Sequence, residues 1–247
     1  MTAAPQANRP EPGPRLTLAD LRAIEDRDHV QPDPLAWLDH EAHALELRGF
    51  PRRQLDQIVR IGRQDRRWPT WPIADRGDDP VGLLADDLQQ GSIVVLMGGY
   101  GTGKTTLATT LVWRALHAMG RRDAAANRRP FRLPASRARF AAAQDYIEDV
   151  RTRGFAPGTN VGKIIRADTE AVPLLVLDEL HQVRGSDDDD LTLDRILNDR
   201  YERMAGTVLV TNLKPKPFEE FMRARNLSRL AEAGQIITCT WGSFREP

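Results

Sequence analysis

Residues 98–106 carry the first chemistry that the sequence offers, because their spacing fits the pattern G-x-x-x-x-G-K-T. They are Gly98, Gly99, Tyr100, Gly101, Thr102, Gly103, Lys104, Thr105 and Thr106. Gly98, Gly101 and Gly103 allow positive φ angles, so that backbone N–H groups can turn toward one anion. Lys104 offers a charge for β- and γ-phosphates, Thr105 a hydroxyl for Mg²⁺, and Thr106 a contact to an α-phosphate. The stretch therefore predicts a cradle for the phosphates of a nucleotide.

A glycine-rich turn could also meet this spacing by chance, so the flanking elements matter. Residues 93–97 form a short apolar run, which predicts a buried strand leading into the turn. Behind the turn, apolar residues recur at helical spacing from Leu107 to Met119, and Gly120 is expected to end that helix. Both flanks fit a phosphate-binding loop, so nucleotide binding is favoured over chance.

An acidic pair ends a second apolar run. Residues 172–177 are almost continuously apolar, as in a strand that is buried on both faces of a parallel sheet. Asp178 and Glu179 follow at its carboxyl end, where such sheets place their ligands. Asp178 is expected to hold Mg²⁺ through water, and Glu179 to polarise the attacking water as a general base. These roles predict hydrolysis of ATP.

A third apolar strand, residues 207–211, ends at Asn212. The amide of Asn212 can orient a water beside a γ-phosphate. The alternative is an asparagine that closes a strand at a turn before Pro215. With the two other motifs present, the sensing role is favoured for Asn212. His181 is either a spectator or a residue that contacts the site residues from behind, and the spectator role is favoured. The sequence thus predicts that three strand ends meet around one triphosphate.

Composition limits the other functions that the chain can have. Lys+Arg and Asp+Glu are equal at 35 each, so no global charge indicates a nucleic acid or a membrane partner. No apolar run is long enough for a membrane span, and residues 1–14 lack the apolar part of a secretory signal. The single cysteine, Cys239, excludes an internal disulfide. We therefore expect a cytoplasmic protein with no membrane partner.

Two local stretches could hold single-stranded DNA. Arginines at 60, 63, 66 and 67 precede Trp68 and Trp71, and basic residues beside aromatics suit single strands. The alternative, that the tryptophans pack against the main domain, is favoured. A second arginine-rich stretch covers residues 121–139 and either contacts phosphates or is a solvated loop. Both interpretations of that stretch stay open.

The chain divides into three parts on composition and periodicity. Residues 1–15 are rich in Pro and Ala and predict a disordered tail. Helical periodicity with breaks over residues 16–64 and a polar stretch at residues 75–79 predict a small helical N-terminal appendage with a linker, residues 16–79. Residues 80–247 alternate strands and helices, which predicts an α/β core. Its last strand is expected at 236–241, and the acids at 187–190 are expected to stabilise the first turn of a helix.

The order of these motifs resembles that of the DnaC-type helicase loaders and of the IstB-type transposition helper ATPases, both of the AAA+ class. The resemblance extends from about Gly49 to Arg245 and includes residues 198–201 ahead of 207–212, then 228–230 and 242–245. A further segment, Gly49-Phe50-Pro51-x-Arg53, is similar to one that these proteins carry ahead of the ATPase core.

The resemblance implies an AAA+ P-loop NTPase core with a five-stranded parallel sheet and no C-terminal lid, since few residues follow Asn212. Carried over by residue, it makes Lys104 and Thr105 the contacts to ATP and Mg²⁺. Asp178 and Glu179 become the Walker B pair, Asn212 the first sensor, and Arg229 the arginine finger. Two positions depart from the family: Ser228 stands where Asp is usual, and Phe244 stands in place of Tyr before Arg245.

An arginine finger implies a homo-oligomeric ring or spiral with ATP between subunits. The leading hypothesis is an ATPase that binds single-stranded DNA and loads a replicative helicase. The first alternative keeps the ATPase and acts with a transposase, and the second is a nucleotide-gated adaptor with little turnover, against which Glu179 and Asn212 argue. A RecA-like core and a small-molecule kinase fit the motifs less well.

Overall fold

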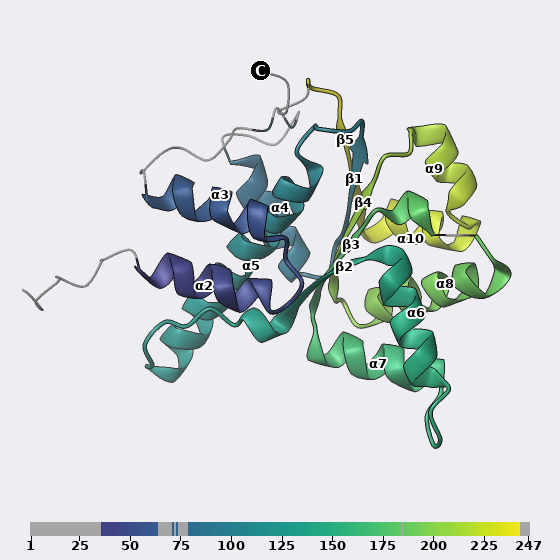
Figure 1. Cartoon of the computed structure of the whole chain (residues 1–247), viewed down its shortest axis with the longest axis horizontal. Coiled ribbons are helices and arrows are strands. Elements are labelled where there is room, and N and C mark those ends of the chain that lie inside the picture. Colours follow the sequence, from purple (N-terminus) through teal and green to yellow (C-terminus); the bar gives the residue numbers. More distant parts are fainter. Residues whose placement is uncertain (1–35, 64–70, 72, 74–78, 184, 243–247) are drawn as a thin grey trace, which may run out of the picture. The chain divides into compact units, whose positions relative to one another are not determined.

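The computed structural model describes residues 36–63, 71, 73, 79–183 and 185–242. One twisted sheet runs through this part of the chain, with helices on both of its faces (Figure 1). Several sequence-based predictions fall outside the described residues: the disordered tail, the start of the helical appendage, Trp68, Phe244 and Arg245.

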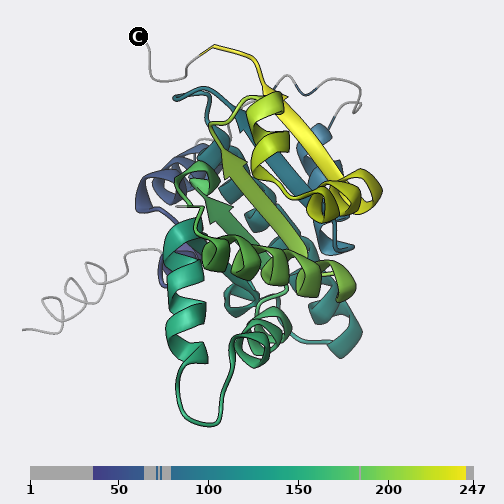
Figure 2. The same ribbon diagram turned by 90° about the vertical axis from the view of Figure 1, so that its right-hand side faces the viewer.

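The sheet has five parallel strands in the order β2-β3-β4-β1-β5 (Figure 2). The strands are β1 (Ile93–Gly98), β2 (Ala138–Ala142), β3 (Leu174–Asp178), β4 (Gly206–Thr211) and β5 (Gly234–Cys239). The central strand β1 pairs with β4 on one side and with β5 on the other. The predicted α/β fold with a five-stranded parallel sheet is confirmed. The last strand begins at Gly234, ahead of the expected residue 236, because the chain leaves the preceding helix directly into the sheet.

Two layers of helices bury the two faces of the sheet. The first layer is α2 (Ala36–Glu46), α3 (Arg52–Arg63), α4 (Pro80–Gln89) and α5 (Lys104–Asn127). The second is α6 (Ala143–Gly154), α7 (Val161–Ala171), α8 (Asp187–Glu202), α9 (Pro215–Phe221) and α10 (Ala224–Ala233). Alternate strand residues serve the two cores: Val94 and Leu96 pack with the first layer, and Val95 and Met97 with the second. Among the described residues, no helix is both long and apolar enough to cross a membrane.

Helix α5 corrects one prediction, because it continues through Gly120 to Asn127. A Cβ at position 120 would lie 2.6 Å from the carbonyl oxygen of Arg132 and 2.9 Å from the ring of Phe131. Glycine is therefore needed there for the close approach of the returning chain, and it does not end the helix. The helix ends instead at Arg128, which takes a left-handed conformation (φ 50°) and donates its N–H to the Ala124 carbonyl.

The acids at 187–190 lie in the first turn of α8, as predicted. Ser186 caps this helix, since its side-chain oxygen accepts from the Asp189 N–H. Arg151 of α6 donates to Asp189 at 2.8 Å, so one of these acids also joins two helices. The acidic run therefore stabilises local structure.

Arg200 of α8 is buried, with 1% of its surface exposed. Its guanidinium donates to the Thr207 hydroxyl at 2.7 Å and to the carbonyl oxygens of Val172, Pro173 and Gly206 at 2.8 to 3.0 Å. Burial lowers the pKa of this guanidinium to about 10. One side chain thus ties the starts of β3 and β4 to α8.

We expect Arg200→Met to lower the free energy of unfolding by roughly 3 kcal/mol, because it leaves several buried acceptors without a donor. Urea unfolding followed by circular dichroism measures the change. Arg203→Met is the matched control, since Arg203 is an exposed residue of the same region whose ion pairs are with Asp199 and Glu170, and it is expected to cost less than about 1 kcal/mol. Equal stability of the Arg200→Met variant and the wild type would contradict this account.

Candidate nucleotide-binding site

The glycine-rich turn connects the end of β1 to the start of α5. Gly101 and Gly103 have φ angles of 81° and 77°, which residues with a side chain rarely adopt. Gly103 is the N-cap of α5, so this helix of 24 residues directs its positive dipole end at the turn. The turn therefore has the backbone and the helix end that anion binding requires.

Lys104 is buried beneath the turn, with 7% of its surface exposed. Its Nζ donates to the carbonyl oxygens of Gly98 at 2.9 Å and Gly99 at 2.6 Å. Neutral carbonyl oxygens fix the ammonium without cancelling its charge, and a buried charge is stabilised by an anion. The position of Lys104 therefore fits a phosphate group.

Thr102 and Trp241 support the turn from outside. The Thr102 hydroxyl donates to the Gly99 carbonyl at 3.0 Å, and the Trp241 indole N–H donates to the Thr102 carbonyl at 2.9 Å. Cys239 lies beneath the same turn, where burial raises the pKa of its thiol to about 11. The segment after β5 thus helps to shape the glycine-rich turn.

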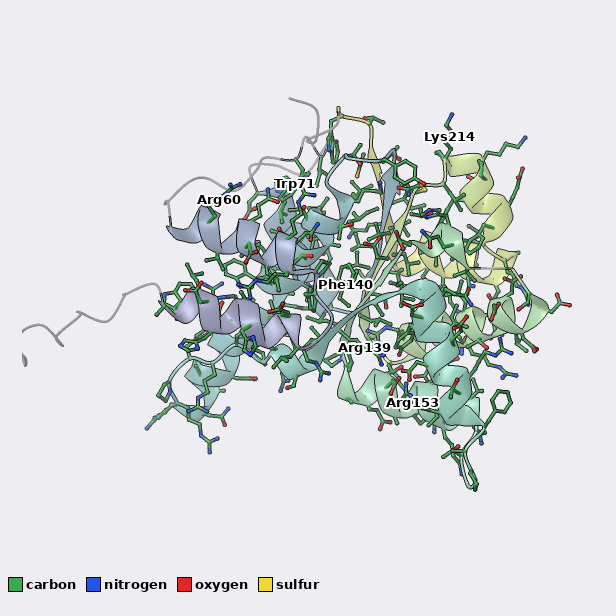
Figure 3. All side chains as sticks on the ribbon, in the orientation of Figure 1. Arg60, Trp71, Arg139, Phe140, Arg153 and Lys214 are labelled. Carbon is green, nitrogen blue, oxygen red and sulfur yellow. The ribbon has the colours of Figure 1, made fainter. Side chains whose placement is uncertain are left out.

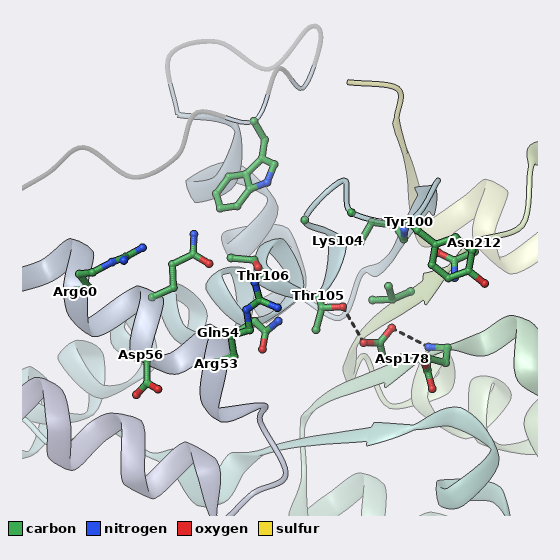
Figure 4. A pocket seen from close by; sticks show the side chains of 16 residues that line it. Arg53, Gln54, Asp56, Arg60, Tyr100, Lys104, Thr105, Thr106, Asp178 and Asn212 are labelled. Atoms are coloured by element: carbon green, nitrogen blue, oxygen red, sulfur yellow. Dashed lines mark hydrogen bonds between the residues drawn. The ribbon is translucent and has the colours of Figure 1, made fainter. Parts of the chain in front are cut away.

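Thr105 and Asp178 join the turn to the acidic strand end. The Thr105 hydroxyl donates to Asp178 Oδ2 at 2.9 Å, and Asp178 Oδ1 accepts from the Glu179 N–H at 2.8 Å (Figure 4). A hydroxyl and a carboxylate in contact form an all-oxygen ligand set, which fits Mg²⁺. Residues 73 positions apart are thereby brought to one point.

Glu179 follows Asp178 in a left-handed conformation, with φ 54° and ψ 37°. A residue with a side chain costs about 1 kcal/mol or more in this region, and such positions cluster at functional sites. Leu180 is fully buried and holds the 3-10 turn Leu180–Gln182 in the core, while the Glu179 side chain stays exposed. The carboxylate is thus available to a water in the site.

Asn212 lies at the end of β4 and contacts His181, with 3.2 Å between Asn212 Nδ2 and His181 Nε2. The sequence favoured a spectator role for His181, but the structure places it against the predicted sensor. When Nε2 accepts from the amide, the proton of a neutral imidazole lies on Nδ1. In that tautomer, His181 fixes the direction in which the Asn212 amide points.

We expect His181→Phe to lower kcat for ATP hydrolysis by about fivefold with little change in KM, because Asn212 loses the acceptor that orients its amide. His181→Gln keeps a side-chain acceptor and is expected to restore part of the rate. Steady-state ATPase kinetics give both constants. His40→Phe, on an exposed position of α2, is the control. A change confined to KM would contradict a positioning role.

Residues from the three strand ends line one cavity of about 650 Å³. The predicted residues that line it are Tyr100, Gly101, Gly103, Lys104, Thr105, Thr106, Asp178, Glu179 and Asn212. Gly98, Gly99 and Thr102 do not line it and instead hold Lys104 and the turn in place. The geometry thus brings the predicted phosphate, metal and water-activating residues to one place, and their roles stay predictions.

The sequence reasoning missed one wall of this cavity. Helix α3 contributes Arg53, Gln54, Asp56, Gln57 and Arg60, and the segment ahead of α4 contributes Trp71. The available signal was the segment Gly49-Phe50-Pro51-x-Arg53 ahead of the core. Phe50 of that segment is buried and packs on Phe140 of β2 with 5.5 Å between ring centroids, which fixes α3 beside the sheet.

Trp71 packs in the core rather than at the surface, with 3% of its surface exposed. It joins the hydrophobic cluster of α2 to α5 and lies on the same side of the sheet as α3 (Figure 3). The packing alternative is therefore observed for Trp71. Trp68, its partner in the single-strand hypothesis, lies outside the described residues.

Arg229 lies away from the cavity, in the interface between α10 and α8. It is buried with 8% of its surface exposed, and its guanidinium donates to the side-chain oxygens of Asn226 and Asn198. It also lies over the Tyr201 ring at 5.6 Å, and burial lowers its pKa. Within its own chain Arg229 is thus a bound, buried side chain, and its role as an arginine finger stays a prediction.

The arginine-rich stretch begins near the C-terminal end of α5, at the far end of the helix from the glycine-rich turn. By the helix rise of about 1.5 Å per residue, the two ends of α5 are roughly 35 Å apart. Arg128, Arg129 and Arg132 are exposed, whereas Arg139 is in an ion pair with Asp149 at 3.1 Å. The stretch is thus a basic surface that is separate from the cavity.

No protein-family model and no curated protein matches the chain. Among solved structures, AMPPCP-bound DnaA from Aquifex aeolicus is 20% identical with a TM-score of 0.44, over 64% of this chain and 44% of that one. A DnaC helicase loader is 18% identical with a TM-score of 0.48, over 64% and 85%. DnaA bound to AMPPCP and single-stranded DNA is 19% identical with a TM-score of 0.48, over 69% and 47%.

The chain spans less than half of these two DnaA chains. The assignment of its fold rests on the sheet order and on the positions of the motifs within the sheet. The described chain has an α/β fold with a five-stranded parallel sheet, in which a glycine-rich turn, an acidic pair and an asparagine at three strand ends line one cavity.

Proposed function

We propose that the protein is an AAA+ ATPase that binds ATP with Mg²⁺ and hydrolyses it. The observation that supports this most directly is the 2.9 Å hydrogen bond between Thr105 and Asp178. It joins the phosphate-binding turn to the acidic strand end and so brings metal-binding oxygens beside Lys104. Glu179 and Asn212 line the same cavity, which adds a candidate base and a candidate water-orienting amide.

In this proposal, different residues of the chain have different roles in the reaction. Backbone N–H groups of the turn and Lys104 bind the phosphates and stabilise their charge in the transition state. Thr105 and Asp178 would hold Mg²⁺, which when bound neutralises charge on the phosphates. Glu179 accepts a proton from the attacking water, and Asn212 orients that water. Both groups stand at strand ends, so packing of the sheet holds them in place.

We further propose that the protein assembles into a homo-oligomeric ring or spiral with ATP between subunits. Arg229 is compatible with this proposal because it lies away from the cavity of its own chain, so any nucleotide that it contacts belongs to a neighbouring subunit. For that role its guanidinium leaves Asn198 and Asn226 as subunits associate. Arg245, the second arginine implied by the resemblance, lies outside the described residues.

The proposed work of this ATPase is to bind single-stranded DNA and to load a replicative helicase. The exposed arginines at the end of α5 support a phosphate-binding surface, since clustered arginines neutralise nucleic-acid backbones. A transposition helper that acts with a transposase would use the same ATP site. An adaptor with little turnover would bind ATP there without the need for Glu179.

The test is an ATPase assay with and without single-stranded DNA, together with size-exclusion chromatography in the presence of ATP or ADP. We expect DNA to raise the rate several-fold and ATP to give a larger species. Binding of ATP without turnover would favour the adaptor. If DNA does not change the rate of ATP hydrolysis and ATP does not change the size of the particle, the proposed helicase-loading role is wrong, whereas the proposed ATPase activity stands. Co-elution of the ATP-bound form with a replicative helicase or with a transposase separates the two clients.

A further inference from the structure

Trp241, in the segment that follows β5, is held beside the glycine-rich turn by the pairing of two strands. β5 lies next to β1 in the sheet (Figure 2), and their register places Cys239 opposite Gly98, the residue at which β1 ends. The chain therefore reaches Trp241 two residues past the level at which the turn begins. The Trp241 ring is half-buried and packs against the core on the α5 side of the sheet. Packing thus fixes the indole against the outside of the turn.

The hydrogen bond from Trp241 sets the direction of one peptide group in the turn. The indole N–H donates to the Thr102 carbonyl oxygen at 2.9 Å. The peptide between Thr102 and Gly103 is trans, and in a planar trans peptide the C=O and the next N–H point in opposite directions. Gly103 lines the cavity, whereas Thr102 and Trp241 do not. The Gly103 N–H therefore points away from Trp241 and toward the cavity.

This direction needs a support, because Gly103 is the residue at which the peptide can rotate. Its φ of 77° has no steric penalty in glycine, but glycine adopts negative φ equally well, and that rotation would turn the N–H outward. Among the described residues, no acceptor holds the Gly103 N–H from the cavity side. The Thr102 hydroxyl donates to the Gly99 carbonyl at 3.0 Å, which fixes the side chain of Thr102 and not its carbonyl. The indole is thus the contact that holds this peptide.

We propose that Trp241 is a positioning residue for nucleotide binding, which keeps the Gly103 N–H directed at a phosphate by holding the Thr102 carbonyl. The inference rests on the proposed function, because it needs a phosphate in the turn. A donor that already has its direction loses no free energy to reorganisation when the anion binds.

The same peptide links Trp241 to the nucleotide in both directions. The indole holds its carbonyl end and a phosphate accepts from its N–H end, so each contact favours the peptide orientation that the other requires. Such coupling is reciprocal in free energy. The segment after β5 therefore responds to occupancy of the turn, although it does not line the cavity.

The experiment compares Trp241→Phe with the wild type by calorimetry, using ATP and inorganic tripolyphosphate as probes, each with Mg²⁺. Trp113→Phe is the matched control: Trp113 is also half-buried, packs against the same core, and donates its indole N–H to Glu41 at 3.0 Å outside the cavity. Steady-state ATPase kinetics give kcat and KM. Nuclear magnetic resonance of the wild type measures hydrogen exchange at the indole N–H of Trp241, with and without tripolyphosphate.

We expect Trp241→Phe to bind ATP and tripolyphosphate about fivefold more weakly, because the N–H that loses its direction serves the phosphates. KM for ATP should rise to a similar extent with kcat within about twofold of the wild type, since the contact is made in the ground state and the transition state alike. Saturation with tripolyphosphate should slow exchange of the Trp241 indole N–H about fivefold, by reciprocity. Trp113→Phe should bind both ligands as the wild type does, and exchange at Trp113 should not change.

Other outcomes overturn the inference in distinguishable ways. Wild-type affinity of Trp241→Phe for both ligands would remove the positioning role and leave the ATPase intact. A lower kcat with unchanged affinity would show that Trp241 only stabilises the fold, and a loss confined to ATP would show that it does not act on the phosphates. If the wild type binds neither ligand, the proposed function itself fails. Should Trp241→Phe not fold, exchange in the wild type decides: a rate that tripolyphosphate leaves unchanged overturns the inference.

Discussion

Glu179→Gln is expected to lower the rate of ATP hydrolysis by at least about a hundredfold while ATP still binds. A general base contributes roughly 10²- to 10⁴-fold, and an amide cannot accept the proton of the attacking water. Glu179 makes no contact with Lys104 or Thr105 among the hydrogen bonds of the described site, so the phosphate cradle stays intact. Single-turnover hydrolysis and equilibrium binding of ATP measure the two effects separately.

The matched control for this variant is Glu219→Gln, an exposed glutamate on α9. It makes the same chemical change outside the cavity and is expected to leave both the rate and the affinity as they are. If Glu179→Gln hydrolysed ATP at the wild-type rate, Glu179 would not be the base. Loss of ATP binding together with turnover would instead assign the residue to ligand binding.

Lys104→Ala carries the other large expected effect, a loss of ATP affinity of at least about a hundredfold. The ammonium is buried and positioned by the Gly98 and Gly99 carbonyls, so it contributes charge-assisted hydrogen bonds to phosphate in a poorly solvated place. Such bonds are about twice as strong as those between neutral groups, and the Coulomb attraction adds to them. Calorimetry with Mg-ATP measures the loss.

Lys163→Ala controls for the removal of a lysine, since Lys163 is an exposed residue of α7 far from the turn in the chain. Circular dichroism and urea unfolding of the Lys104→Ala variant check that its fold is retained. Tripolyphosphate should lose as much affinity as ATP, because Lys104 acts on the phosphates. A folded Lys104→Ala variant that binds ATP normally would disprove the phosphate cradle.

Local patterns in the sequence predicted the strands and the polar residues that end them. Apolar runs shorter than a helix, followed by Lys104, Asp178 and Asn212, indicated buried parallel strands with ligand-binding ends. Parallel strands place their carboxyl ends at one edge of the sheet, so the meeting of these residues followed from the fold class. The same local reasoning misread Gly120, because its neighbours Phe131 and Arg132 reach it only through the returning chain.

By itself, then, the sequence predicted the sheet, which the structure confirms, and picked out the glycine-rich turn, the acids and the amide that line one cavity, because each depends on residues that are close together in the chain. Only the tertiary structure decided what surrounds them. Packing of α3 against the core places Gln54 and Trp71 in the wall of the cavity. His181 contacts Asn212, which is 31 residues away in the chain, and Arg229 contacts Asn198, which is also 31 residues away. The spacing of residues in the sequence does not predict these contacts. They form because the apolar faces of separate helices pack against one sheet, which places the polar residues next to those faces close to one another.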